Sequence, residues 1–302
     1  MQLTPTDWPA PAKLNWFLHV IGRREDGYHD LQTLFQFVDL HDRIRIRPRE
    51  DGHLRLQGGL AGLAPEQDLA MRAARLLQAH TQYRLAQCRL GADIEVEKRI
   101  PAGGGLGGGS SDAATVLIAL NHVWGLGLNL DELAALGLTL GADAPVFVLG
   151  QAAWAEGVGE RLTPVPETFG LAEPWYLILY PGRGVSTAAV FSDLKLTCHT
   201  PAITMRALPT SQAKLPRRND LEPSARKRCP EIGAALDWLN RQTGVDRVGM
   251  TGSGACVFAA CADQAAARRL GGTVPAPWQG FVTRGQNRSP LHATLDAIQA
   301  LR

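Results

Sequence analysis

The sequence predicts an α+β protein that is built from two domains. With 302 residues, the chain is longer than a single hydrophobic core usually serves. Segments with the two-residue period of strands alternate with segments that have helical spacing. Residues from about 162 to 174 are rich in proline and glycine, as linkers between domains are. We therefore expect an N-terminal domain over 1–163 and a C-terminal domain over 164–302.

The strand and helix periods predict the secondary structure of the first half of the chain. We expect strands over 12–21, 32–38, 43–47 and 94–100, and helices over 70–80 and from the end of a glycine loop to Trp124. The strand over 94–100 carries charges on one face, which is typical of an antiparallel strand with one face in water. Asn129 and Glu132 then form a capping-box pattern, which predicts the start of another helix.

Residues 133–150 form the longest weakly charged stretch of the chain. Asp143, Pro145 and several glycines interrupt it, so we expect a helix followed by a strand and not a membrane span.

The strand over 43–47 lies among many charges. Arginines alternate along it, and acidic residues surround them, namely Asp39, Asp42, Glu50 and Asp51. A surface that binds nucleic acid would concentrate basic residues instead. We therefore expect these side chains to form a solvated strand face.

The second half interleaves strands and helices as a split β-α-β arrangement does. We expect strands over 175–180, 255–261 and 280–284, and helices over 231–240 and 263–270. Residues 200–219 hold many prolines and basic residues without a clear period. This segment is expected to be an exposed loop or a set of short helices.

A glycine-rich loop joins the strand over 94–100 to the next helix. Its six glycines allow positive φ angles and a close approach of the backbone to a ligand. The helix start adds unpaired N–H groups and a partial positive charge. These features predict a phosphate-binding site. Its residues are Pro101, Ala102, Gly103, Gly104, Gly105, Leu106, Gly107, Gly108, Gly109, Ser110 and Ser111.

Other interpretations fit this loop less well. Its glycines satisfy the dinucleotide fingerprint G-x-G-x-x-G, but a Rossmann strand is buried on both faces, and the expected acid would fall near Asp131, which opens a helix. No lysine precedes Ser110, so the P-loop pattern fails as well. A purely structural glycine turn stays open, although so many glycines carry a heavy entropic cost.

A second glycine loop lies near the end of the chain and consists of Thr251, Gly252, Ser253 and Gly254. Alone it predicts a tight turn as readily as a ligand contact. Together with the first loop it gains weight, because backbone N–H groups from both could approach one phosphate at a domain interface.

Composition limits the classes of function. The net charge of +2 argues against a dedicated nucleic-acid binder, and residues 1–11 show no signal-peptide pattern. Five scattered cysteines without a C-x-x-C pair indicate reduced thiols and no cysteine-bound metal. We expect a cytoplasmic protein that needs no membrane, nucleic acid or obligate protein partner.

Three motifs, taken in order along the chain, resemble those of the GHMP small-molecule kinases. They are the run from Pro11 to Asn15, the first glycine loop and the second glycine loop. Residues 26–29, 34–36 and 141–147 further resemble the branch of this superfamily whose substrate is a cytidyl-capped methylerythritol. The resemblance spans most of the chain and is weakest over 163–219.

The resemblance implies a fold and an activity. The expected fold has an N-terminal domain like domain 2 of ribosomal protein S5 and a ferredoxin-like C-terminal domain, with the active site between them. The expected reaction is ATP- and Mg²⁺-dependent phosphorylation of the 2-hydroxyl of the cytidyl-capped methylerythritol, a step of the non-mevalonate isoprenoid pathway. A GHMP kinase for another alcohol, such as homoserine or a mevalonate derivative, and a nucleotide-binding sensor without catalysis stay open as alternatives.

The resemblance also assigns roles to individual residues. Asp143 is the expected base, and Lys13 is its partner, an ammonium that stabilises charge at the reacting centre. Asn15 is expected to position the substrate. Without the motifs, Asp143 would pass for a cap or turn carboxylate, Lys13 for a surface cation and Asn15 for a residue that satisfies nearby backbone.

Cytosine recognition falls, by the same resemblance, to Tyr28 and His29, with Phe191 as a second stacking ring. A hairpin tip alone would explain the first two, and Phe191 could equally belong to the core. Many GHMP kinases use a glutamate to bind Mg²⁺, and this sequence has no clear counterpart. The metal is therefore expected to be held mainly by ATP phosphates and water, with Ser110 or Ser111 as a candidate ligand.

Overall fold

The computed structural model describes residues 7–82, 89–193, 200–204 and 215–300. Cys88, Cys198 and part of the 200–219 segment lie outside these ranges. The strands are β1 (Asp7–Arg23), β2 (His29–Arg49), β3 (Leu54–Gly58), β4 (Gly91–Glu97), β5 (Ala153–Gly157), β6 (Arg161–Pro164), β7 (Trp175–Tyr180), β8 (Val245–Met250), β9 (Val257–Cys261) and β10 (Gln279–Gln286). The helices are α1 (Leu69–Gln82), α2 (Gly108–Val123), α3 (Leu130–Leu138), α4 (Ala144–Leu149), α5 (Thr187–Ser192), α6 (Glu222–Arg228), α7 (Pro230–Asn240), α8 (Gln264–Gly271) and α9 (Pro290–Ala300).

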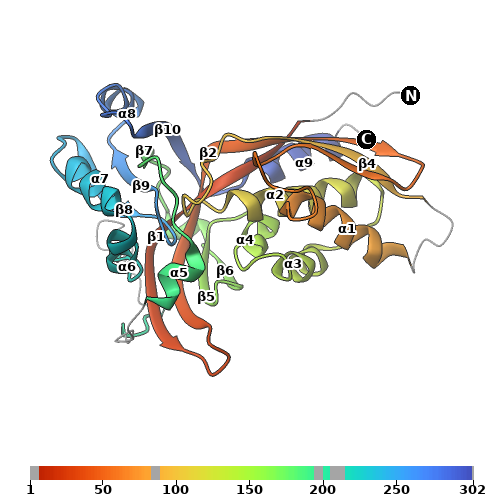
Figure 1. Cartoon of the computed structure of the whole chain (residues 1–302), viewed down its shortest axis with the longest axis horizontal. Coiled ribbons are helices and arrows are strands. Elements are labelled where there is room, and N and C mark those ends of the chain that lie inside the picture. Colours follow the sequence, from red (N-terminus) through yellow and green to blue (C-terminus); the bar gives the residue numbers. More distant parts are fainter. Residues whose placement is uncertain (1–6, 83–88, 194–199, 205–214, 301–302) are drawn as a thin grey trace.

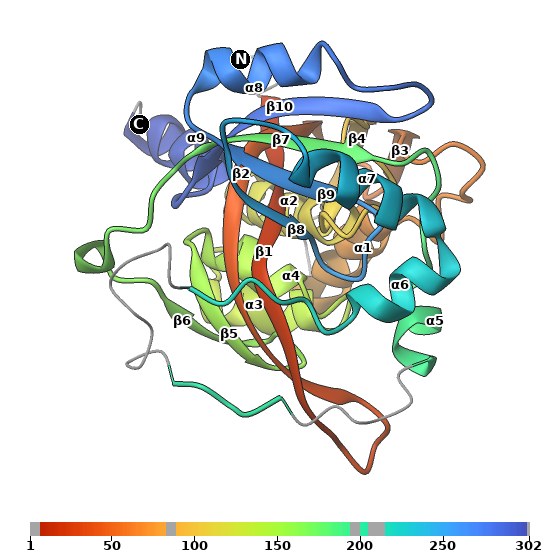
Figure 2. The same ribbon diagram turned by 90° about the vertical axis from the view of Figure 1, so that its left-hand side faces the viewer.

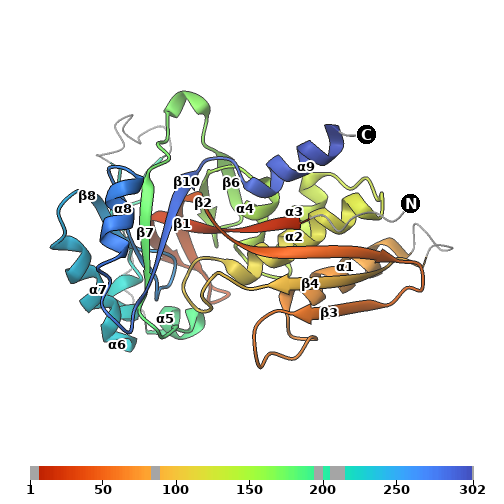
Figure 3. The ribbon, with the colours of Figure 1, turned by 90° about the horizontal axis from the view of Figure 1, so that it is seen from above.

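One sheet runs through the whole molecule, in the order β3-β4-β2-β10-β7-β9-β8, with β1 and β5 also paired to β2 (Figures 1 and 3). The strands of the two halves meet where Gly285 and Gln286 of β10 pair with Val38 and Phe37 of β2. The pairs are antiparallel except β3 with β4. The α+β class is therefore confirmed.

The second half contains the predicted split β-α-β arrangement. Its four strands lie in the spatial order β10-β7-β9-β8, and α7 and α8 pack against them (Figure 2). A second hydrophobic cluster lies under these helices and includes Ile232, Leu236 and Val257, together with Leu18, Val20 and Leu31 from the β1–β2 hairpin.

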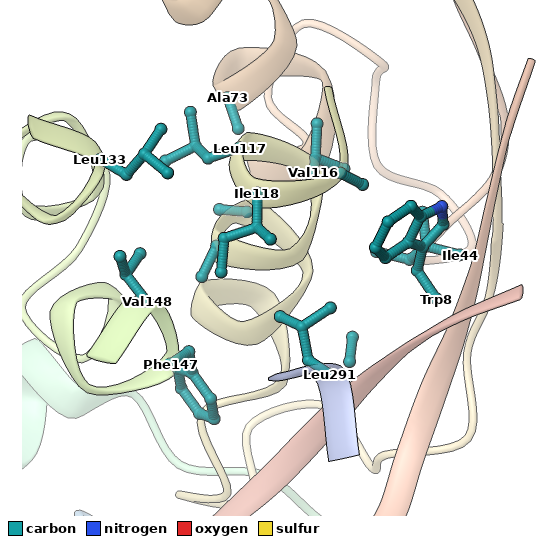
Figure 4. Packing of buried hydrophobic residues seen from close by; sticks show 14 of the residues in the cluster. Trp8, Ile44, Ala73, Val116, Leu117, Ile118, Leu133, Phe147, Val148 and Leu291 are labelled. Atoms are coloured by element: carbon teal, nitrogen blue, oxygen red, sulfur yellow. The ribbon is translucent and has the colours of Figure 1, made fainter. Parts of the chain in front are cut away.

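The core of the first half lies between the sheet and helices α1 to α4. Val116, Leu117 and Ile118 of α2 lie at its centre, as Figure 4 shows. Leu291 from α9 joins the same cluster, so the last helix packs against the first half of the chain. The division into domains at residue 163 stays a prediction.

Two predictions about the first half are wrong. The strands expected over 32–38 and 43–47 are one strand, β2, because the extra residues between them are absorbed by a bulge opposite Pro11 and Ala12. The strand expected after Asp143 is the helix α4. Pro145 lies in its first turn, where the missing N–H costs no helical hydrogen bond.

Other predicted features of the first half agree with the structure or differ from it for local reasons. The strand expected over 94–100 is β4, which ends at Glu97, because the N–H groups of Arg99 and Ile100 turn to the carboxylate of Asp42. The alternating arginines of β2 are partly or fully exposed, as expected of a solvated face, whereas Asp42 beside them is fully buried. The capping box of Asn129 and Glu132 is confirmed. Within the described ranges, no helix is long and apolar enough to cross a membrane.

Candidate active site

A cavity of about 930 Å³ lies between the β1–β2 hairpin, the start of α2 and α5. It brings together residues from most parts of the chain. Its lining includes Lys13, Asn15, Arg23, Tyr28, His29, Thr33, Phe35, Leu69, Gly105, Gly107, Gly108, Gly109, Ser110, Asp143, Thr187, Phe191, Gly252 and Ser253.

Lys13 and Asp143 form an ion pair in this cavity. The Lys13 Nζ lies 3.2 Å from the Asp143 Oδ2. The lysine side chain is 3% exposed and lies over the ring of Phe35, whereas the carboxylate is 32% exposed and reaches the cavity. Asp143 precedes α4, yet its side chain caps no N–H group of the described residues. The geometry therefore does not support a purely capping role for this carboxylate.

Asn15 connects Lys13 to the second glycine loop by hydrogen bonds. Its amide oxygen accepts hydrogen bonds from the Lys13 Nζ (2.7 Å) and from the Gly252 N–H (2.9 Å). Its amide nitrogen donates to the Thr33 hydroxyl (2.9 Å). The Asn15 N–H donates to Thr251 Oγ1 (3.1 Å), because a bulge in β1 after Asn15 turns this group away from β2.

The helix α2 points its N-terminus at the cavity. Gly107 precedes the helix with φ of 76°. Because glycine has no side chain, no side-chain group caps the start of the helix. The first helical bond of the backbone is donated by Ser111 to the Gly107 carbonyl. The N–H groups of Gly108, Gly109 and Ser110 are therefore left without an intrahelical acceptor, and all three residues line the cavity. This is an arrangement that favours an anion such as phosphate.

The two glycine loops lie against each other, as the sequence predicted they could. The N–H groups of Ala255 and Cys256 donate to the carbonyls of Gly103 (3.1 Å) and Gly104 (3.0 Å). At Gly105, which has φ of 73°, an added Cβ atom would lie 2.2 Å from the Thr251 carbonyl oxygen. Only glycine fits this approach.

The predicted phosphate-site residues divide into two groups. Gly105, Gly107, Gly108, Gly109, Ser110, Gly252 and Ser253 line the cavity. The others, Pro101, Ala102, Gly103, Gly104, Leu106, Ser111, Thr251 and Gly254, do not line it. Several of these support the loop. Leu106 is buried in the core, and the Thr251 hydroxyl donates to the Gly105 carbonyl (3.3 Å).

The serine hydroxyls at the start of α2 offer few ligands to a metal ion. The described residues contain no group of three or more His, Cys, Asp or Glu side chains that could hold one. Ser110 lines the cavity, and the buried Ser111 hydroxyl has no hydrogen-bond partner among the described residues. One serine could thus supply a single ligand to a Mg²⁺ ion whose other ligands are phosphate and water oxygens.

Three aromatic side chains mark the hairpin end of the cavity. The rings of His29 and Phe191 are stacked, with centroids 5.4 Å apart and an angle of 29° between their planes. Tyr28 is 64% exposed at the hairpin tip. Burial, followed by the charge of Arg23, lowers the pKa of His29. The ring is therefore neutral at pH 7 and can both donate and accept a hydrogen bond.

Some cavity residues were not predicted. Thr33 supports Asn15, and the hydroxyls of Thr187 and Ser253 lie 2.8 Å apart, which joins α5 to the second glycine loop. Arg23 lies across the hairpin from His29. Isolated threonines and arginines carry no local signal, and only the fold brings these ones to the cavity.

An anion cradle beside a Lys–Asp pair supplies the groups that a protein needs to transfer a phosphoryl group. Models of the N-terminal and C-terminal domains of GHMP kinases match residues 68–151 and 202–279. The chain belongs to the GHMP kinase family and is therefore a small-molecule phosphotransferase that uses ATP.

Similar proteins of known name narrow the class of kinase. The chain is 54% identical to 4-diphosphocytidyl-2-C-methyl-D-erythritol kinase of Alkalilimnicola ehrlichii, over 97% of this chain and 95% of that protein. It is 50% identical to the protein of the same name from Halorhodospira halophila, over 95% of this chain and 96% of the relative. A crystal structure of 4-(cytidine 5'-diphospho)-2C-methyl-D-erythritol kinase superimposes with a TM-score of 0.79 at 36% identity and covers 93% of this chain and 99% of that one. The predicted resemblance is thus confirmed.

Proposed function

We propose that this chain transfers the γ-phosphoryl group of ATP to the 2-hydroxyl of 4-diphosphocytidyl-2-C-methyl-D-erythritol, in the non-mevalonate isoprenoid pathway. The observation that carries this proposal is a single cavity with two different ends. One end holds the Lys13–Asp143 pair beside a glycine cradle, and the other holds the stacked rings of His29 and Phe191. A triphosphate and a cytidyl-capped alcohol can therefore meet at Asp143.

The transfer needs an acceptor oxygen that is freed of its proton. Asp143 Oδ2 accepts the proton of the 2-hydroxyl as the oxygen forms its bond to the γ-phosphorus. The bond between the γ-phosphorus and its bridging oxygen breaks, and ADP leaves with the electron pair. Lys13, held by Asn15, stabilises the negative charge that develops between the acceptor and the transferred group.

The phosphates of ATP are assigned to the two glycine loops. The N–H groups of Gly108, Gly109 and Ser110 face the cavity from the start of α2, and Gly252 and Ser253 approach from the other side. Gly105 also faces the cavity, and Pro101, Ala102, Gly103, Gly104 and Leu106 are assigned to the support of the loop behind these groups. A Mg²⁺ ion, when bound to the phosphates, neutralises part of their charge, and Ser110 or Ser111 is the proposed protein ligand.

The cytosine is assigned to the hairpin end. Tyr28 and Phe191 offer rings for stacking, and the neutral His29 can hydrogen-bond the base edge. The described cysteines are free thiols, namely Cys229, Cys256 and Cys261, which supports a cytoplasmic enzyme.

The test is a panel of acceptors with the purified protein, ATP and Mg²⁺. ADP release should require 4-diphosphocytidyl-2-C-methyl-D-erythritol, and mass spectrometry should find the phosphate on its 2-oxygen. Homoserine and mevalonate serve as matched alcohols. Faster turnover of either would assign the chain to another acceptor, and ATP binding without transfer to any alcohol would indicate a nucleotide sensor.

A further inference from the structure

Three charged side chains gather behind the first glycine loop, outside the cavity lining. Asp42 lies in β2, Lys98 follows β4, and Asp112 lies in the second turn of α2. The carboxylates of Asp42 and Asp112 are 0% and 6% exposed, and the lysine side chain is 19% exposed. Burying two carboxylates costs free energy, so an arrangement of this kind needs a compensating role.

The hydrogen bonds of these three side chains join the two ends of the first glycine loop. Asp42 accepts hydrogen bonds from the backbone N–H groups of Arg99 and Ile100 (2.8 Å for Ile100), just before the loop begins. It also accepts from the Lys98 Nζ. The same Nζ donates to Asp112 Oδ2 at 2.6 Å, just after the loop ends. One ammonium thus ties the strand side of the loop to the helix side.

The cluster lies directly behind the phosphate-facing N–H groups. A Cβ atom added at Gly108 would lie 3.5 Å from Asp42 Oδ2 and 3.1 Å from the Ile100 side chain. The loop between Ile100 and Gly108 is mostly glycine, so its backbone loses much conformational freedom when it is ordered. Anchors at both ends of the loop restrict its backbone before a ligand binds. Less conformational entropy is therefore lost when a triphosphate binds.

The charge of the cluster is uneven. Two carboxylates share one ammonium, and burial raises the pKa of Asp112 above its usual range, with Lys98 opposing this effect and Asp42 adding to it. Asp42 from β2 and Lys98 from beyond β4 are the charged groups that face it, and α1 presents the apolar Leu69 to Gly109 nearby. Asp112 Oδ1 has no hydrogen-bond partner among the described residues.

We propose that Asp42, Lys98 and Asp112 form a clamp that positions the first glycine loop for the phosphates of ATP. None of the three lines the cavity, so they are positioning residues and not catalytic ones. The inference rests on the proposed function only in taking ATP as the ligand of this loop. It predicts that the clamp sets the affinity for ATP and leaves the acceptor site unchanged.

The test compares Asp112→Ala with Asp112→Asn. The alanine variant removes the tie between Lys98 and α2, whereas the asparagine oxygen still accepts from Lys98. We expect the dissociation constant of ATP, measured by calorimetry without acceptor, to rise about tenfold in Asp112→Ala, the loss of one charge-assisted hydrogen bond, and to be largely restored in Asp112→Asn. The KM for the acceptor should not change.

The control separates positioning from stability. Leu77→Ala removes a fully buried side chain from α1 and should lower the thermal midpoint without weakening ATP binding. If Asp112→Ala and Leu77→Ala lower the midpoint alike and neither changes ATP affinity, the clamp is purely structural and the proposal is overturned.

The clamp and the proposed function fail separately. Because ATP binding is measured without acceptor, a wild type that binds ATP but phosphorylates no cytidyl acceptor would contradict the proposed function alone.

Discussion

The two ends of the cavity differ in how firmly their groups are held. At the glycine end, Lys13 is almost fully buried and is fixed by Asp143 and Asn15, and the two loops share backbone hydrogen bonds. At the hairpin end, Tyr28 is mostly exposed, and His29 contacts α5 through the stacked ring of Phe191.

The difference reflects what each end must do. Phosphoryl transfer depends on donors and charges that are in place before the transition state forms, because their reorganisation would cost free energy at that moment. Binding of a base needs rings that can close on it. Changes at the glycine end should therefore lower kcat or ATP affinity, and changes at the hairpin end should raise the KM for the acceptor.

Gly105→Ala should have the largest effect on the glycine end. The new Cβ atom would meet the Thr251 carbonyl at 2.2 Å, so the loops must separate. The positive φ alone costs about 1–2 kcal/mol, and we expect the free energy of unfolding to fall by more than this and ATP binding to be lost.

Gly62→Ala is the matched control for this change. Gly62 has φ of 81° and nothing within 4 Å of an added Cβ atom. It carries the backbone strain without the clash. Equal losses of stability in the two variants, with ATP binding kept in both, would show that the contact between the loops is not required.

Phe191→Ala should have a smaller effect and act at the other end. Stacking of an aromatic ring on a base contributes about 1–3 kcal/mol, so we expect the acceptor KM to rise roughly tenfold or more, while the dissociation constant of ATP stays the same. Phe191→Leu keeps an apolar side chain but not the ring, and steady-state kinetics of both variants separate stacking from packing. An unchanged acceptor KM in Phe191→Ala would make this residue part of the core only.

How much the sequence predicts also differs between the two ends. The glycine loops, Lys13 and Asp143 belong to short motifs, so local pattern was enough to select them. Their pairing joins residues that are far apart in the chain, and only the sheet with its β1 bulge shows that Asn15 connects Lys13 to Gly252.

One wrong prediction and one missed residue have a common physical cause. The segment after Asp143 is apolar and short, and such a run has the same appearance in a buried strand and in a buried helix such as α4. Asp42 lies among exposed charges in the sequence, and nothing local shows that its carboxylate is turned inward to the N–H groups of Arg99 and Ile100. In both cases the partner that decides the structure lies elsewhere in the chain.

The account depends most on the carboxylate that faces the acceptor, and Asp143→Asn tests it directly. The amide keeps the size of the side chain but cannot accept the proton. We expect single-turnover phosphorylation of the cytidyl acceptor to slow by about 10²–10⁴-fold, with ATP binding retained and with Asp131→Asn, an exposed residue of α3, as an unaffected control. Transfer by Asp143→Asn at the rate of the wild type would contradict the account.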